Sequence, residues 1–463
     1  MTTRSIIFRA AIFLGLAALV VVFLVEANRR HGLYWYDVHQ DYRYSFNQDN
    51  ARKVTVKVTS TGVKIPKLEG AWDTVLLPIN VEATVTGSWF EPTIAVHARQ
   101  EERTHSFERG ARGLRYLVLN PEEVRSGGML RLSASHIRWE EQDSDLLLFS
   151  TPEIRDTDVL ILAPHPDDAE IAAFGLYSGH QSFVATVSAG NYVDGLYAHL
   201  APDHDDQDSL RGRVRAWDSL VVPTWGGVEP ERIVNLGYWN GSLQALHDHR
   251  DRETGSPTMP FQDPNRYRGG AIAELVDNRR AEATWNSLVQ DLQAIITNVR
   301  PGVIVAPHPA FDAATDHQYT TIALLEALAA AGDNSTVLLL YTNHNVGSEY
   351  YPFGPAESAV NLPAWFNDSS PYSGIYSYWL SEQDQMNKLF ALEAMHDLRA
   401  APRLLHGGPA LRFATRINAA VDGLIRDPLG TYNYIRRAVR SNEIFFVVRP
   451  EDRSRVEAGF SHR

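Results

Sequence analysis

Two hydrophobic patterns divide the chain. Between residues 45 and 150, short segments alternate apolar and polar positions with a period of two, as in "KVTVKVTS" (Lys53 to Ser60). Turn residues and charged clusters separate these segments, which is typical of antiparallel strands with one buried face. We therefore expect a β-sandwich-like accessory domain over residues 45–150.

After residue 155 the apolar runs become continuous and alternate with helical periodicity. Buried strands are predicted for "DVLILA", "SFVATVSA", "RIVNLG", "GVIVAP" and "STVLLLYT", whereas "TWNSLVQDLQAIITNV" spaces its apolar residues by three and four. Such alternation is typical of parallel sheets covered by helices on both faces. The pattern predicts an α/β fold over residues 155–450, built on a doubly wound, mostly parallel, Rossmann-like sheet.

A third pattern occupies residues 6–27, where Ala10–Val25 is uninterruptedly apolar. A transmembrane helix needs about 20 apolar residues, a length that this run reaches if Arg9 extends toward the membrane interface. A cleaved signal peptide is the alternative, with "VEA" at residues 25–27 as a tolerable cleavage site. We expect a transmembrane anchor, and a membrane-anchored protein whose catalytic domain is periplasmic or otherwise extracytoplasmic.

Composition and missing motifs exclude several classes of function. In the 463-residue chain, 44% hydrophobic and 21% charged residues are typical of a folded globular protein. A net charge of -13 argues against a nucleic-acid partner, because phosphate binding needs a basic face. The sequence has no cysteine, which excludes disulfides and thiolate chemistry. It also lacks a lysine-bearing phosphate loop and a G-x-S-x-G motif, which disfavours nucleotide hydrolysis and serine hydrolysis.

Candidate chemistry lies just beyond two predicted strands, in "APHPDD" and "APHPAFDAATDH". Ligands of such sheets bind at the carboxyl ends of the strands. His165 and Asp168 share one tight loop and His317 lies beyond the other strand, which gives three ligands of the kind that hold a catalytic zinc. Asp167 diverges from its neighbour Asp168 and is placed to act as a general base. The alternative is a helix cap made by one of the two aspartates.

Several ordered motifs carry a resemblance to a known family. "APHPDDAE" is followed by "TVSAGN", "RAWDSL", "LGYWNGSL", "ATDH" and "KLFALEAMH". Over about residues 155–400 the chain resembles the PIG-L/LmbE-like family of zinc-dependent N-acetylglucosaminide deacetylases. The resemblance implies a zinc cofactor bound by His165, Asp168 and His317, with Asp167 as the general base. Iron or cobalt suits the same ligands.

The resemblance also implies roles for further residues. Asp316 would be a second catalytic residue, which orients or tunes its neighbours. Arg215, Asn240 and His308 are the substrate-binding candidates. Asn240 stands where the family has an aspartate, and Ala314 stands where it usually has a histidine. Loss of one such donor costs about 10²–10³ in rate.

The sequence thus predicts a zinc-dependent amidohydrolase that removes N-acetyl groups from an N-acetylated sugar. Its substrate would be a polysaccharide or a lipid-linked glycan. Two alternatives remain open on the same fold. One is a non-catalytic glycan-binding or assembly protein, which Ala314 and Asn240 motivate, and the other is an O-acetyl esterase.

Overall fold

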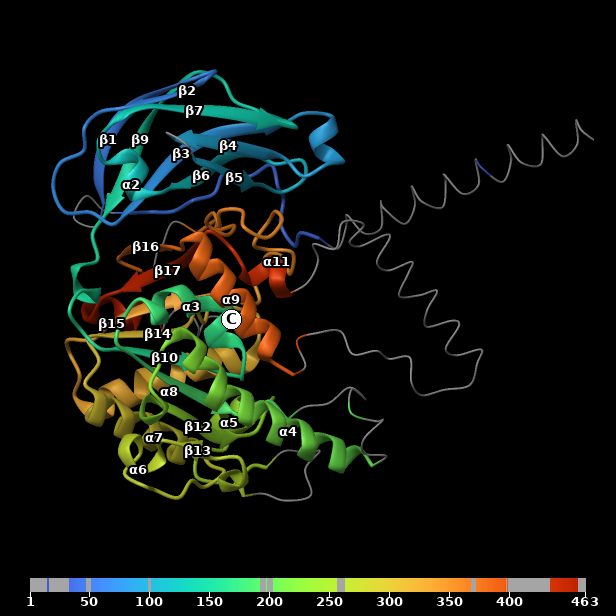
Figure 1. Ribbon diagram of the computed structural model, residues 1–463, viewed down its shortest axis with the longest axis vertical. Coiled ribbons are helices and arrows are strands. Elements are labelled where there is room, and N and C mark those ends of the chain that lie inside the picture. Colours follow the sequence, from blue (N-terminus) through green and yellow to red (C-terminus); the bar gives the residue numbers. More distant parts are fainter. Residues whose placement is uncertain are drawn as a thin grey trace, which may run out of the picture.

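The computed structural model contains two β-sheets, one in the N-terminal third of the chain and one in the remainder (Figure 1). It describes residues 33–46, 51–98, 101–191, 203–255, 263–367, 372–396 and 434–456, together with Gly15, Tyr197 and Leu398.

The N-terminal sheet has nine strands, all of them paired antiparallel, in the order β5-β4-β7-β2-β1-β9-β3-β6, with β8 beside β3. The prediction of a β-sandwich needs correction here, because hydrogen bonds link these strands into one continuous sheet. The strands are β1 (Arg52–Thr59), β2 (Gly62–Ile65), β3 (Thr74–Ala83), β4 (Thr93–Ala98), β5 (Glu101–Ser106), β6 (Arg112–Leu119), β7 (Gly128–Ser135), β8 (Ile137–Arg138) and β9 (Gln142–Phe149), with the short helix α2 (Pro121–Val124) before β7.

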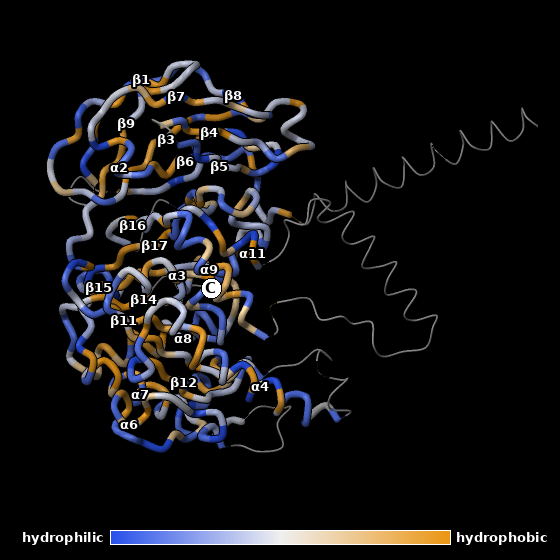
Figure 2. The backbone as a smooth tube through the Cα atoms, in the orientation of Figure 1, coloured by the Kyte–Doolittle hydropathy of each residue, from blue (hydrophilic) through white to orange (hydrophobic). Residues whose placement is uncertain are grey.

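Some strands of this sheet bury both faces. On β3, Val75 and Leu77 face the core of the N-terminal sheet, whereas Leu76 belongs to the cluster that continues into the second sheet. Figure 2 shows the resulting mixture of hydrophobic and hydrophilic positions along the strands. Because this hydrophobic cluster contains residues of both sheets, it does not mark a boundary between them. The division into domains at residues 45–150 and 155–450 therefore stays a prediction.

The second sheet has eight strands in the order β13-β12-β11-β10-β14-β15-β17-β16. The pairings from β12 to β15 are parallel, whereas β13, β17 and β16 pair antiparallel. The strands are β10 (Val159–Ala163), β11 (Ser182–Ser188), β12 (Ile233–Tyr238), β13 (Gly269–Gly270), β14 (Val303–Pro307), β15 (Val337–Tyr341), β16 (Gly374–Trp379) and β17 (Asn442–Val448).

The predicted fold class, a doubly wound and mostly parallel sheet, is therefore wrong. The sheet is mixed, and it lies beside the antiparallel N-terminal sheet. The physical reason is that a helix between two strands permits a parallel pairing but does not require one. α9 (Glu382–Ala394) connects β16 to β17, yet these two strands run antiparallel.

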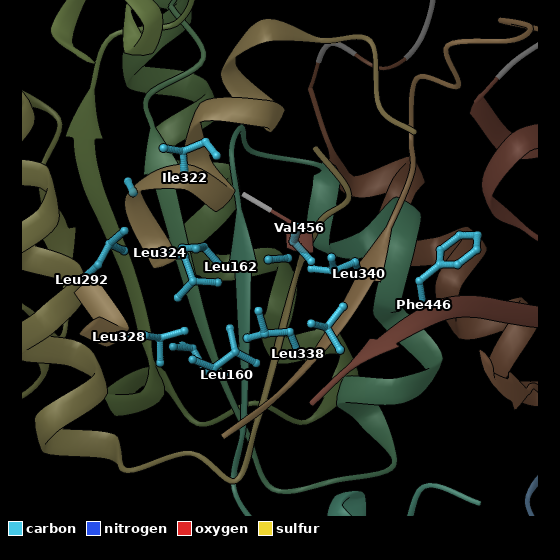
Figure 3. Close-up of a cluster of buried hydrophobic side chains, with 14 of the residues drawn as sticks. Leu160, Leu162, Leu292, Ile322, Leu324, Leu328, Leu338, Leu340, Phe446 and Val456 are labelled. Carbon is cyan, nitrogen blue, oxygen red and sulfur yellow. The ribbon is translucent and has the colours of Figure 1, made fainter. Parts of the chain in front are cut away.

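Helices cover both faces of the second sheet. α7 (Trp285–Val299) and α8 (Thr315–Ala331) pack on one face, and α3 (Asp168–Ser178) and α9 pack on the other. Figure 3 shows leucines of β10 and β15 facing leucines of α7 and α8. Among the residues that the structure describes, the remaining α-helices are α4 (His204–Val221), α5 (Leu243–Asp248), α6 (Ile272–Leu275) and α11 (Tyr434–Ala438).

The predicted transmembrane anchor and the membrane-anchored, extracytoplasmic location also need correction. Within the residues that the structure describes, no helix is both long and apolar enough to cross a membrane. Residues 6–27 lie outside these described residues, except Gly15.

Candidate metal centre and its cavity

The loop between β10 and α3 presents the first group of site residues. His165 lies between two prolines, and its backbone N–H donates to Asp168 Oδ2 at 3.0 Å. Asp167 has a φ of 120°, a conformation that non-glycine residues rarely adopt. This turn directs the side chain of Asp167 toward Arg215 and that of Asp168 toward His165 and His317.

Three potential ligand atoms converge at the carboxyl edge of the sheet. His317 Nε2 lies 3.1 Å from Asp168 Oδ2 and 3.3 Å from His165 Nδ1. The third distance, from His165 Nδ1 to Asp168 Oδ2, is 3.3 Å. Ligands about 2.0–2.2 Å from a tetrahedral zinc ion are roughly 3.3 Å apart, so this spacing fits such an ion.

On each histidine, the ring nitrogen that faces away from the other two potential ligands lies beside a further carboxylate. His165 Nε2 lies 3.1 Å from Asp316 Oδ2, and His317 Nδ1 lies 3.1 Å from Asp312 Oδ2. Asp316 is itself held by the backbone N–H of Gly241, at 2.6 Å. When the rings are neutral, as metal binding requires, the two carboxylates keep a proton on the outer nitrogen of each ring and leave the inner nitrogens free as ligands.

The close spacing of these histidines and carboxylates shifts their pKa values. Burial lowers the pKa of His165, but hydrogen bonds and charges from Asp168 and Asp316 outweigh it and raise the pKa to about 9. Burial raises the pKa of Asp168, yet the two histidines hold that pKa well below its usual range. The raised pKa of His165 means that its ring holds a proton toward Asp168 when no metal is bound, and a divalent ion would displace that proton. The donor set therefore fits a bound divalent metal ion, and His165, Asp168 and His317 together can hold one.

A cavity of about 150 Å³ opens beside these ligands. Arg215 Nη2 lies 3.0 Å from Asp167 Oδ2, and the same guanidinium donates to the carbonyl of Pro166. This arrangement fixes the carboxylate of Asp167 at the wall of the cavity. The cavity is lined by His165, Asp167, Asp168, Ile171, Gly190, Arg211, Arg215, Asn240, His344 and Tyr434.

Residues 160–328 match the family model described as PIG-L: GlcNAc-PI de-N-acetylase. This part of the chain is a PIG-L-family domain. The match begins in β10 and ends in α8, so the PIG-L domain includes the three potential ligands and both supporting carboxylates. The resemblance inferred from the motifs is thereby confirmed for this segment.

Two other comparisons add little to the PIG-L match. No curated protein matches the chain. Among solved structures, GalB, the 4-carboxy-2-hydroxymuconate hydratase from Pseudomonas putida KT2440, is 13% identical with a TM-score of 0.32, over 63% of this chain and 95% of that one. A family two carbohydrate esterase from Cellvibrio japonicus is 12% identical with a TM-score of 0.14, over 66% of this chain and 86% of that one. Similarities this low do not identify a function.

The structure places most of the predicted site residues of the PIG-L domain around one point. Asp167, Arg215 and Asn240 line the cavity beside the ligands, and Asp316 lies directly behind His165.

His308 lies elsewhere. It is fully buried, and its Nδ1 accepts the backbone N–H of Ala310 at 3.1 Å. Its ring packs against the rings of Phe311 and Phe446. This position favours a role in fixing the loop after β14 over contact with a substrate.

Sequence reasoning missed four residues of the site. It assigned no role to Asp312, although this residue lies in the quoted segment "FDAATDH", five positions before His317. It also missed Asn343, His344 and Tyr434. The first two follow β15, and the rule that ligands bind at the carboxyl ends of strands was a usable signal for them. No pattern in the sequence indicates that Tyr434, on the distant helix α11, reaches the cavity.

Proposed function

We propose that the chain is a zinc-dependent amidohydrolase that removes the N-acetyl group from an N-acetylated sugar. The PIG-L match supports a de-N-acetylase acting on a GlcNAc-type sugar. The observation that carries the proposal is the converging donor set, in which two supported imidazoles and one carboxylate lie 3.1–3.3 Å apart at the wall of a cavity. His165, Asp168 and His317 would hold the zinc, which polarises an acyl carbonyl and a water when bound.

The remaining side chains would move protons and hold the reacting groups. Asp167 accepts the proton of the attacking water at its carboxylate. The water oxygen bonds to the acyl carbon, the C–N bond breaks, and the proton passes to the departing amine, which leaves acetate and a free amino sugar. Arg215 positions Asp167 through their 3.0 Å ion pair, and Asp316 fixes the ring of His165.

A single carboxylate-to-amide change tests the base. With zinc present, the purified full chain is expected to release acetate and free amine in equal amounts from N-acetylglucosaminides. Asp167→Asn should lower kcat by about 10²–10⁴-fold while zinc remains bound, because the change removes the proton acceptor and no ligand. Amine release is followed with an amine-reactive fluorophore, and bound zinc by elemental analysis.

Asp156→Asn is the matched control, because Asp156 is an exposed aspartate just before the opposite end of β10. It should leave the rate unchanged. Full amidase activity in Asp167→Asn would reject Asp167 as the base. Failure of the zinc-loaded chain to release amine from any N-acetylated glycan would reject the proposed function itself.

A further inference from the structure

A second cavity, of about 860 Å³, lies between the two sheets, and it shares no lining residue with the cavity at the metal centre. Its walls come from both sheets, including the strands β5 and β16, each of which lies at the edge of its sheet. The backbone N–H of Ser377 on β16 donates to Thr74 Oγ1 on β3 at 2.9 Å, which joins the sheets here. Figure 1 shows β16 on the side of the second sheet that faces the N-terminal sheet. We call this space the inter-sheet cavity.

Aromatic side chains form the wall that β16 contributes to the inter-sheet cavity. Tyr376, Tyr378 and Trp379 all line it. The guanidinium of Arg103 on β5 lies over the ring of Trp379, 5.0 Å from its centroid, and Arg103 Nε donates to Glu123 Oε1 at 2.7 Å. Aromatic rings offer apolar faces to a ligand and attract cations to those faces.

Two hydrogen-bond donors on the lining have no acceptor. The Nε1–H groups of Trp72 and Trp379 are buried, and neither has a hydrogen-bond partner among the residues that the structure describes. Trp72 as a whole is only 3% exposed. Buried indole N–H groups usually have a partner, and an unpaired one calls for an explanation. A ligand that brings oxygen acceptors into the inter-sheet cavity would supply it.

The lining also carries an excess of negative charge. Five carboxylates and three guanidiniums line the inter-sheet cavity. Burial raises the pKa of Asp73, although the backbone N–H of Thr151 opposes this, and burial raises the pKa of Glu123 in spite of Arg103. The positive charge nearby therefore does not fully offset the burial of these carboxylates. A cationic ligand would add what is missing, whereas a phosphate would add to the excess.

We propose that the inter-sheet cavity binds an oligosaccharide of amino sugars, which is the de-N-acetylated product of the PIG-L site. The hydroxyl oxygens of the sugar accept the two indole N–H groups, its apolar ring faces pack on the aromatic wall, and its ammonium groups lie near the carboxylates. This inference rests on the proposed function for the identity of the sugar, and deepens it. The cavity would retain a glycan that already carries free amino groups.

Other ligands of similar size satisfy fewer of these groups. A fully N-acetylated oligosaccharide brings hydroxyl oxygens but no cation. A lysine-rich peptide brings cations, but each of its residues adds a backbone N–H donor to a lining whose unpaired groups are themselves donors. An amino sugar combines cations, oxygen acceptors and apolar ring faces in one ligand.

Calorimetry on the zinc-loaded full chain tests the proposal, with Asp167→Asn in every arm so that acetylated ligands are not converted. At pH 6, where the amino groups are protonated, a glucosamine hexasaccharide should bind about tenfold more tightly than the N-acetylglucosamine hexasaccharide. Trp379→Ala should weaken binding of the amino sugar by about tenfold, because it removes the ring and one unpaired donor. Raising NaCl from about 0.05 M to about 0.3 M should also weaken it.

A second variant keeps the test independent of how well Trp379→Ala folds. Glu122→Gln changes an exposed glutamate on the lining and should weaken binding of the amino sugar by about threefold. The matched controls are Trp225→Ala and Glu140→Gln, an exposed tryptophan and an exposed glutamate that do not line the cavity. Both should leave the affinity unchanged.

Three results would overturn the inference. They are no binding of the amino sugar, equal affinity for the two hexasaccharides, and binding that neither Trp379→Ala nor Glu122→Gln weakens. Pentalysine is the competing cation, and if it bound as tightly as the amino sugar and with the same dependence on Trp379, the cavity would not be selective for a sugar and the proposal would fall.

The outcome is separable from that of the proposed function. If the zinc-loaded wild-type chain releases no amine from any N-acetylated glycan, but the amino sugar binds and its binding depends on Trp379, the proposed function fails and this inference stands. If the chain releases amine but does not bind the amino sugar at the inter-sheet cavity, the inference fails and the proposed function stands.

Discussion

Each sheet of the molecule carries a buried charged cluster, and the two clusters differ in how their polar atoms are satisfied. In the N-terminal part, Arg115 Nε lies 3.2 Å from Glu108 Oε2, and the rest of the guanidinium donates to the backbone carbonyls of residues 38, 40 and 114. The hydroxyls of Tyr36 and Tyr42 donate to the same glutamate. Every charge in this cluster, the Glu108 cluster, has its counterpart within the protein.

The metal centre of the second sheet has the opposite arrangement. His165, Asp168 and His317 turn three potential ligand atoms toward one point, and the outer nitrogens of both rings are directed away toward Asp316 and Asp312. Both clusters are buried and charged, but only the second gathers three potential ligand atoms that could hold a metal ion. Buried charge by itself does not indicate a functional site, whereas converging ligand atoms with shifted pKa values beside a cavity make a site a candidate.

The largest expected effect comes from removing one of the converging ligands. His317→Ala should abolish tight zinc binding and lower amine release by at least about 10³-fold, because a Lewis acid contributes several kcal/mol to such a reaction. Zinc per chain, measured by elemental analysis after dialysis, and the rate of amine release check this. Far-ultraviolet circular dichroism should remain that of the wild type. A His317→Ala chain that keeps one zinc and its activity would contradict the assignment of this ligand.

The matching change in the Glu108 cluster should affect stability and leave chemistry intact. Arg115→Met leaves Glu108 buried without its cation, which costs about 3–5 kcal/mol in the free energy of unfolding. Urea unfolding measures the loss, and the kcat of the folded chain should be unchanged. Adding Glu108→Gln removes the uncompensated charge and should recover part of the loss. If Arg115→Met lowered zinc content at full folding, the two clusters would not be independent.

The sequence was most informative where histidine and aspartate residues come soon after a predicted strand. His165, Asp168 and His317 were predicted as ligands because each follows an apolar run that must be buried, and because the carboxyl ends of adjacent parallel strands meet. Asp312 was missed because its role depends on which nitrogen of His317 faces the metal, and side-chain direction on a loop follows from no sequence pattern. His344 was missed because its strand, β15, brings no motif with it.

The direction of the strands at the edge of the second sheet was also not predicted from the sequence. Hydrophobic runs identified strands in both regions, but burial is equally satisfied by a parallel or an antiparallel neighbour. In β17, Phe446 contributes to the cluster on one face and Phe445 to the cluster on the other. Such a strand is buried on both sides whichever way it runs, so the mixed character of the sheet could not be derived from hydropathy alone.

The smallest expected effect concerns a histidine that lies between the two sheets and belongs to neither cluster. His105 of β5 is buried, and its Nδ1 lies 2.8 Å from the side-chain oxygen of Asn361. Burial lowers the pKa of His105 to about 4, because the surroundings disfavour the charged ring and Arg103 and Arg440 add to this. The hydrogen bond to Asn361 acts in the opposite direction.

The sign of the pH dependence follows from this lowered pKa. Above pH 6.5 the ring is neutral in both the folded and the unfolded chain, so His105 contributes its full stability there. As the pH falls from 6.5 toward 4, His105 is protonated in the unfolded chain but stays neutral in the folded chain. The free energy of unfolding therefore decreases. Between pH 7 and pH 5.5 this loss amounts to about 1 kcal/mol. Urea unfolding of the zinc-loaded wild type and of zinc-loaded His105→Gln, each at both pH values, isolates the contribution of His105. Every other titrating group is common to the wild type and the variant. An equal loss in both would show that His105 accepts a proton in the folded state, and that the junction between the sheets, unlike the Glu108 cluster, tolerates an uncompensated charge.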